Sequence, residues 1–315
     1  MLTSYTIKNN VLATIMPSKE ALWLEDAVWI DLVNPTAEEI KTVEVFTGIS
    51  LPNIQETEEI EASSHYEIYP TGLQINCSFL NKTDGVYLNK NVAFLYNSNC
   101  LISLCAHEIP AIRLLQKQWQ KAERLTTDPL SSIIALHEIK IDSLADFSEE
   151  AYLAIEKISR QIFERANTNL EKTIDDLSVQ DDLNGKIRLC LMDGQRDLNF
   201  LLRRVKLTED NTNDSNDRLE DIKTLLSHNS FLSEKIDFLL NAALGFINIE
   251  QNKIIKIFSI AAVVLMPPTV IASIYGMNFH FMPELSWRWG YPLSVFLMIA
   301  AGISPYIYFK RKGWL

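Results

Sequence analysis

Two long segments near the C-terminal end of the chain carry no charged side chain. Residues 257–275 and 291–309 each run for 19 residues without Asp, Glu, Lys or Arg. A helix needs ~20 apolar residues to cross the ~30 Å core of a bilayer, so both segments are long enough. A pair of buried core helices is the alternative, but the flanking residues favour a membrane hairpin. We therefore expect transmembrane helices over 254–275 and 291–309.

Basic side chains flank this hairpin on one side only. They precede the first segment and follow the second, whereas the loop 276–290 carries one acid and one arginine beside a histidine. The flanking basic residues are Lys253, Lys256, Lys310, Arg311 and Lys312. The positive-inside rule places both termini and the tail 310–315 in the cytoplasm, with the loop outside.

The first 253 residues have the composition of an acidic soluble body. They contain 24 basic and 39 acidic residues, a net charge of −15, whereas the remainder carries +4. This charge argues against a nucleic-acid partner, because phosphate binding requires a basic face. The four cysteines form no CxxC pair, so neither a zinc knuckle nor a thioredoxin-like motif is indicated. No cleaved signal peptide is expected, since the first residues lack an apolar stretch.

The acidic body divides into a β-rich part and a helical part. Short β-type runs occupy residues 5–7, 27–33, 65–69, 73–80 and 92–105. Thr36, followed by two acids, is a helix start signal. Helical patterns then cover 109–124, 130–168, 170–207 and 216–275, with a turn-like segment at 208–215. We predict an α+β cytoplasmic domain over 1–108 and a helical region over 109–253, whose last helix continues into the first membrane segment.

Small and polar residues recur on one face of the first membrane segment. Alternating steps of three and four define this seam: Asn252, Ile255, Ser259, Ala262, Met266, Thr269, Ser273 and Gly276. Polar groups inside a membrane need partners or water, and a two-helix hairpin cannot enclose a pore alone. The seam therefore favours a homo-oligomer whose first segments surround an axial pathway. A small-residue packing face in a dimer is the alternative.

The end of the first segment allows two interpretations. Pro267 and Pro268 should kink the helix or loosen its hydrogen bonds. Gly276 then suits a simple helix stop. Alternatively, Asn278 contributes to a ring of amides at an outer mouth, where carbonyl oxygens suit hydrated Mg²⁺.

Several strings resemble the CorA family of magnesium and cobalt transporters. They are residues 266–269 (MPPT), 275–279 (YGMNF), 282–285 (MPEL) and the ending 308–315 (YFKRKGWL). The similarity extends to 245–252 and 28–32, and so covers most of the chain. It implies a homopentameric funnel in the inner membrane, with a C-terminal two-helix transmembrane hairpin, that passes Mg²⁺ and also Co²⁺ and Ni²⁺.

The resemblance also assigns roles to individual positions. Gly276, Met277 and Asn278 match the pore entrance, and Asn252, Met266 and Thr269 match pore-lining positions. Ile255 and Phe258 fall where the family has an apolar constriction. The family is closed by cytoplasmic Mg²⁺ bound between subunits, which implies that Glu58 and Glu59 face Asp217 or Asp221 of a neighbour. His280 is a departure, since an acid is expected there.

Other classes of function remain as alternatives. One alternative is a membrane-anchored enzyme, but the catalytic motifs expected of such an enzyme are missing from the sequence. His107 and His137 each begin a zincin-like string, but Ala111 and Ile141 stand where the second histidine would be. A membrane-anchored acidic coiled-coil sensor and a Zn²⁺ transporter of the same superfamily stay open. The membrane potential contributes ~4.6 kcal/mol per 100 mV to the inward movement of a divalent cation. Inward flux therefore needs no nucleotide, and no organic cofactor is expected.

Overall fold

The computed structural model of the chain separates into two compact units, Met1–Leu240 and Asn241–Leu315. It describes residues 1–8, 11–15, 26–53, 66–69, 72–83, 85–97, 100–121, 128–164, 169–278, 280 and 282–313. The two units are treated separately below.

The first unit begins with a seven-stranded sheet of order β2-β1-β3-β7-β6-β5-β4. The strands are β1 (Leu2–Lys8), β2 (Val11–Ile15), β3 (Trp29–Val33), β4 (Tyr66–Tyr69), β5 (Gly72–Thr83), β6 (Val86–Asn97) and β7 (Leu101–Cys105). The central strands β3 and β7 pair in parallel, and the other neighbours pair antiparallel. The segment predicted as one β-type run over 92–105 is therefore two strands, because the chain reverses between Asn97 and Leu101.

The central strands β3 and β7 are buried on both faces. Trp29 packs into a core with α2 (Pro110–Gln120) and α3 (Pro129–Glu164), whereas Ile30 and Leu32 pack on the other face with Val43 of α1 (Ala37–Thr47). This alternation follows from the two-residue period of a strand. Thr36 caps α1 as predicted, and its hydroxyl and the Glu39 carboxylate form a reciprocal capping box.

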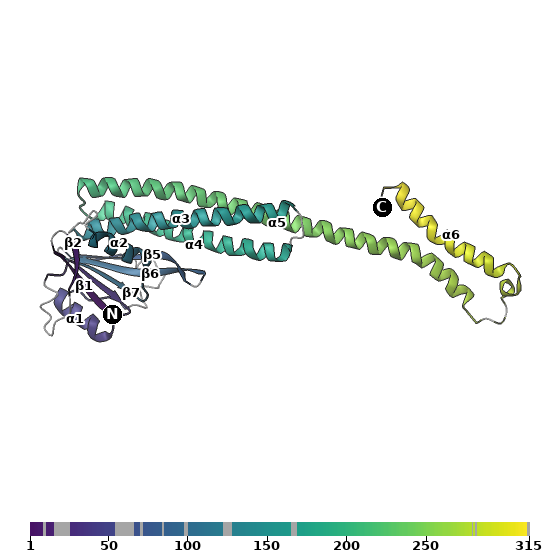
Figure 1. Cartoon of the computed structure of the whole chain (residues 1–315), viewed down its shortest axis with the longest axis horizontal. Helices are drawn as coiled ribbons and strands as arrows, with labels where there is room; N and C mark the ends of the chain where they lie inside the picture. The colour runs from purple at the N-terminus through teal and green to yellow at the C-terminus, as the bar shows by residue number, and fades with distance from the viewer. Residues whose placement is uncertain are drawn as a thin grey trace. The chain divides into compact units, whose positions relative to one another are not determined.

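Three long helices complete the first unit (Figure 1). α3 and α4 (Leu170–Arg204) pack against each other and onto the sheet, and the first part of α5 (Glu209–Tyr275) lies along them. Buried residues of α5 recur at heptad spacing, including Ile222, Asn229 and Ile236. The Asn229 amide donates to Asn184 Oδ1 of α4 at 2.6 Å, a polar pair that fixes the register of the two helices.

The segment predicted as a turn over 208–215 belongs to α5. Thr208 acts as the cap, since its hydroxyl accepts from the Asn211 N–H at 3.2 Å. Asn211 then bonds Asp128 and Ser131 at the start of α3. These tertiary hydrogen bonds stabilise the helical conformation of a segment whose polar composition is typical of a turn.

The second unit contains the end of α5, a short 3₁₀ turn η3 (Pro283–Ser286) and α6 (Gly290–Arg311). Both α5 and α6 include a window long and apolar enough to cross a membrane. α5 remains helical through Pro267 and Pro268. The prolines therefore interrupt only the backbone hydrogen bonds of α5 for which they lack the N–H donor.

Candidate ion pathway in the C-terminal hairpin

The seam predicted from the sequence lies on the exposed surface of α5. All eight residues from Asn252 to Gly276 are exposed in the single chain. Ile255 is 61% exposed, Phe258 71% and Met266 65%, although all three are large apolar side chains. Such a surface is either covered by lipid or by other copies of the chain.

The opposite face of α5 packs against α6. At ~100° per residue, the half-buried residues fall on the side of the helix away from the seam. They are Ile260, Val264, Pro267, Pro268, Ile271 and Tyr275. A Cβ added to Gly302 of α6 would lie 3.3 Å from Pro268 Cγ and 3.4 Å from the Val264 carbonyl oxygen. The glycine thus lets α6 approach the carbonyl that Pro268, which lacks an N–H, leaves without its helical donor.

The Gly-Met-Asn string follows directly on the end of α5. The Gly276 N–H donates to the Ala272 carbonyl at 2.9 Å and the Met277 N–H to the Ile274 carbonyl at 3.3 Å. Asn278 is the next residue, outside any regular element, and it is exposed. The helix therefore ends at the predicted place, but Gly276 does not take the left-handed conformation expected of a glycine stop. The end of the helix is also where the exposed Asn278 lies.

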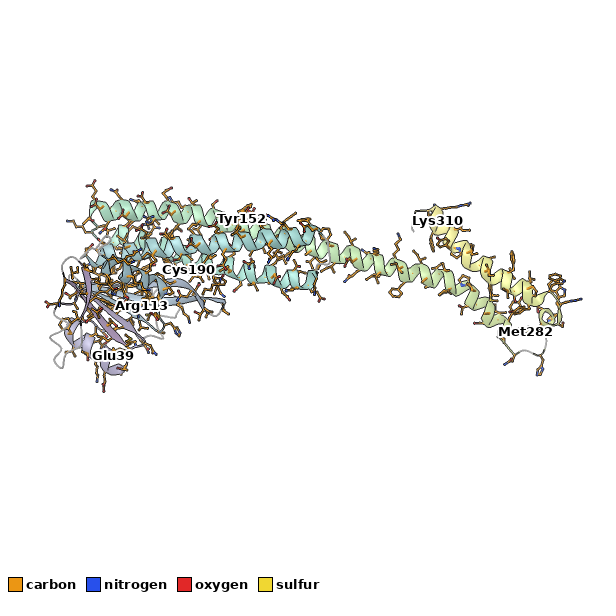
Figure 2. The ribbon with its side chains drawn as sticks, viewed as in Figure 1. Glu39, Arg113, Tyr152, Cys190, Met282 and Lys310 are labelled. Carbon is orange, nitrogen blue, oxygen red and sulfur yellow. The ribbon has the colours of Figure 1, made fainter. Side chains whose placement is uncertain are left out.

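The loop between α5 and α6 is held by close backbone contacts. The Gly290 N–H donates to the Trp287 carbonyl at 2.9 Å, and a Cβ on Gly290 would meet the Glu284 carbonyl oxygen. Only glycine permits this approach. Met282 lies in this loop, and Lys310 lies at the other end of α6 (Figure 2). The loop residues His280 and Glu284 are exposed.

The residues that the resemblance assigns to a regulatory site are only partly described. Glu58 and Glu59 lie outside the described residues. Asp217 and Asp221 are both exposed on α5, one turn apart. Asp221 pairs with Arg218 at 2.9 Å, and Arg218 also pairs with Glu138 of α3 at 3.1 Å. The two aspartates therefore differ in their electrostatic surroundings.

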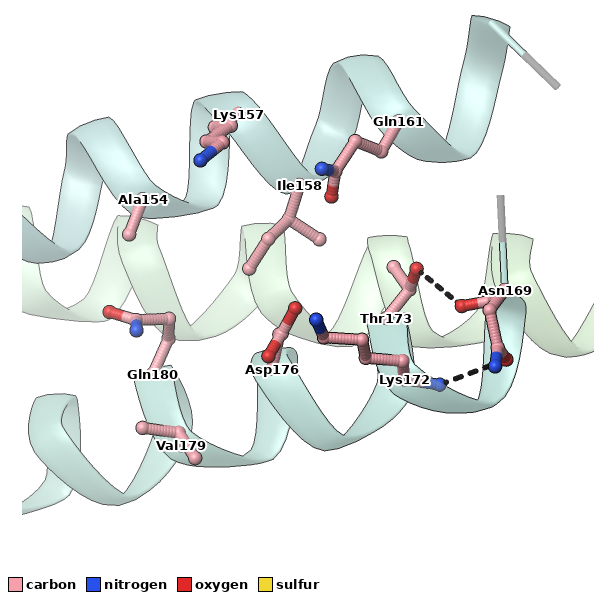
Figure 3. Close-up of a pocket in the computed structure, with 10 residues that line it drawn as sticks. All are labelled: Ala154, Lys157, Ile158, Gln161, Asn169, Lys172, Thr173, Asp176, Val179 and Gln180. Atoms are coloured by element: carbon pink, nitrogen blue, oxygen red, sulfur yellow. Dashed lines mark hydrogen bonds between the residues drawn. The ribbon is translucent and has the colours of Figure 1, made fainter. Parts of the chain in front are cut away.

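A cavity of about 530 Å³ lies between the adjoining ends of α3 and α4 (Figure 3). Lys157 and Lys172 line it together with Asp176. Asn169 caps α4 at its edge by accepting from the Lys172 N–H at 3.3 Å. Two lysines against one aspartate give this cavity no preference for cations, although the two helices carry many acids elsewhere.

Comparisons with known proteins identify the family of this chain. The family model described as "CorA-like Mg2+ transporter protein" matches residues 25–311. The chain is 42% identical over 317 residues to the magnesium transport protein CorA of Salmonella typhimurium and, separately, to that of Escherichia coli K12, covering 100% of both chains in each case.

The structure is similar to the solved CorA magnesium transporter from Methanocaldococcus jannaschii. The TM-score is 0.81 at 18% identity, and the match covers 100% of this chain and 99% of the other. The predicted fold class, an α+β domain followed by long helices and a C-terminal apolar hairpin, is confirmed.

Proposed function

The chain belongs to the CorA-like Mg²⁺ transporter family, and we propose that it forms a homo-oligomeric channel for Mg²⁺ influx across the inner membrane. The exposed seam of α5, on the face opposite α6, supports this proposal most directly. A hairpin cannot enclose a pathway by itself, so several copies turn this face toward a shared axis. The resemblance to the family suggests five copies and places both termini in the cytoplasm.

The outer mouth is assigned to Gly276, Met277 and Asn278. Mg²⁺ gives up its water reluctantly, so neutral amide oxygens can hold it through its inner hydration shell. Asn278 is exposed at the end of α5, so each subunit would contribute one amide to this mouth. Co²⁺ and Ni²⁺ form similar hydrated ions and are the further cargo that the resemblance suggests.

The remaining pathway follows the seam toward the cytoplasm. Met266 and Thr269 lie on the seam below the mouth, and the Thr269 hydroxyl donates to the Leu265 carbonyl at 2.7 Å. Ile255 and Phe258 supply an apolar stretch, which can close a pore by excluding water. Asn252 follows at the cytoplasmic end. Transport needs no nucleotide, because the membrane potential contributes ~4.6 kcal/mol per 100 mV for a divalent ion.

Cytoplasmic Mg²⁺ is proposed to close the channel at a site that includes Asp217. The Arg218 guanidinium neutralises Asp221, which leaves less charge there for a cation. Asp217, one turn before it, is exposed. Glu58 and Glu59 of the adjacent subunit are proposed to complete the site.

Transport by proteoliposomes tests the pathway. Vesicles loaded with a Mg²⁺ dye and held at a negative internal potential should show Mg²⁺ entry with the unaltered chain. Asn278→Ala should abolish entry, whereas Asn213→Ala, an exposed amide of α5 off the seam, should not. Absence of entry with the unaltered chain would favour an anchored sensor. Entry of Zn²⁺ but not Mg²⁺ would favour a Zn²⁺ transporter of the superfamily.

The same vesicles test the proposed closure. Raising internal Mg²⁺ should slow entry through the unaltered chain, and Asp217→Asn should require higher internal Mg²⁺ for the same inhibition. Asp221→Asn is the matched variant and should change this dependence less. Equal effects of the two variants would argue against the choice of Asp217.

A further inference from the structure

Three buried side chains from separate elements meet between the sheet and the helices of the first unit. Cys77 comes from β5, His137 from α3 and Asp197 from α4. Their sulfur, nitrogen and oxygen atoms all lie within 4.8 Å of one another, and each residue is at most 1% exposed. The three positions are far apart in the sequence and form no local motif.

The two ring nitrogens of His137 have separate neighbours. Its Nδ1 lies 2.9 Å from the Ile133 carbonyl oxygen. Its Nε2 lies 3.2 Å from Asp197 Oδ2, on the side of the ring where the Cys77 sulfur also lies. With Nδ1 donating to the carbonyl, Nε2 would present the lone pair that binds a metal ion.

The surroundings of His137 and Asp197 resemble those of metal ligands. A histidine that binds a metal usually donates its other ring N–H to a carbonyl or carboxylate. The Ile133 carbonyl oxygen, 2.9 Å from His137 Nδ1, is placed to accept such a bond. The second oxygen of Asp197 accepts from the Tyr66 hydroxyl at 3.0 Å. In tetrahedral geometry, Zn–N and Zn–O bonds of 2.0–2.2 Å place the two ligand atoms about 3.4 Å apart. The observed 3.2 Å is close to that spacing.

The charges around the cluster permit a divalent cation. Lys140 Nζ lies 2.9 Å from Asp193 Oδ2, so these two charges compensate each other. A divalent cation would bind the thiolate of Cys77, and the thiol proton would be released to solvent. The thiolate and the Asp197 carboxylate would then balance the two positive charges of the ion.

We propose that Cys77, His137 and Asp197 form a buried site for a borderline-soft divalent cation of the Zn²⁺ class. Sulfur and imidazole ligands suit Zn²⁺ and Co²⁺, whereas Mg²⁺ requires oxygen ligands. The site is therefore distinct from the transported Mg²⁺. It links β5 to α3 and α4, and it does not depend on the proposed transport.

Cobalt spectroscopy on the purified full chain tests this site. The protein is stripped with a chelator and titrated with Co²⁺ in the presence of excess Mg²⁺, which occupies oxygen sites. We expect an intense thiolate-to-cobalt charge-transfer band that saturates at one Co²⁺ per chain and disappears when Zn²⁺ is added. Co²⁺ bound by amide or carboxylate oxygens in a pore would give no such band.

Variants assign the band to this cluster. Cys77→Ser should abolish it, whereas Cys100→Ser, a buried thiol on the other face of the sheet, should retain it. His137→Gln should weaken Co²⁺ binding at least tenfold. The proposal is overturned if the unaltered chain shows no band, which needs no variant to fold, or if Cys77→Ser keeps it. The three side chains would then form only a buried hydrogen-bonded cluster.

Discussion

Replacing Lys140 by methionine should destabilise the first unit strongly. The Lys140 side chain is 2% exposed and its Nζ lies 2.9 Å from Asp193, which is 7% exposed. Nζ also lies 5.4 Å from the centre of the Phe79 ring. Methionine keeps the apolar stem but leaves Asp193 buried without its cation, beside Asp197. Breaking a buried ion pair from one side costs about 3–5 kcal/mol.

This cost can be measured as a change in thermal stability. In a unit of this size 1 kcal/mol shifts the melting temperature by about 2–4 °C, so Lys140→Met should lower it by roughly 6–20 °C. The fluorescence of Trp29 and Trp119, both buried in the same core, can follow the transition in detergent. The double variant Lys140→Met/Asp193→Asn should recover part of the loss, because the amide oxygen can still accept from the Ser78 N–H.

An exposed pair provides the control. Lys223 and Glu220 form an ion pair at 2.8 Å with side chains 60% and 74% exposed. Lys223→Met should leave the melting temperature almost unchanged, because water solvates both groups. If Lys140→Met changed the melting temperature no more than Lys223→Met, the reasoning from burial would be refuted. A double variant less stable than Lys140→Met would refute the pairing with Asp193.

Three further outcomes are expected. Gly185→Ala in α4 should raise the free energy of unfolding by about 0.5–1 kcal/mol in chemical denaturation, since the added Cβ meets nothing within 4 Å and alanine favours a helix. Gly290→Ala should reduce Mg²⁺ entry into proteoliposomes, because the added Cβ would overlap the Glu284 carbonyl oxygen. At Gly245 an added Cβ meets nothing within 4 Å, so Gly245→Ala should express and fold normally. Burial raises the pKa of Glu39, but hydrogen bonds from the Thr36 and Leu2 N–H groups outweigh this effect, so the pKa is lowered. The ionised Glu39 carboxylate therefore stabilises the fold at neutral pH, and this stabilisation is lost below about pH 5. Melting temperatures of Glu39→Gln should therefore fall less than those of the unaltered chain as the pH is lowered.

The features predicted correctly are those that local sequence determines. The two membrane segments follow from composition over about 20 residues, and the cap of α1 follows from Thr36 and Glu39, three residues apart. The continuity of α5 follows from the absence of a stop signal before Tyr275, and Gly245 does not break it. Such features need no knowledge of tertiary contacts.

The features that were wrong or missed depend on distant contacts. The segment 208–215 has the composition of a turn, but Asn211 bonds Ser131 of α3 and Asp128, the residue before α3. Cys77, His137 and Asp197 are brought together only by the packing of α3 and α4 on β5. In the sequence, His137 was visible only as the start of an incomplete zincin string. No spacing rule could have joined it to Cys77 and Asp197.

The polar residues on and next to the seam bear on what covers this face of α5. Thr269 satisfies its hydroxyl within the helix by donating to the Leu265 carbonyl, so it would be tolerated on a lipid-facing surface. The Asn252 and Asn278 amides each offer two donors and an acceptor. They lie just beyond the two ends of the segment 254–275, where water can satisfy them. Because the seam lies opposite α6, the other helix of the hairpin cannot cover it. Lipid or other copies of the chain must therefore do so. In the proposed axial pathway, several α5 helices cover one another's seams and keep the amide at each end of the seam in contact with water.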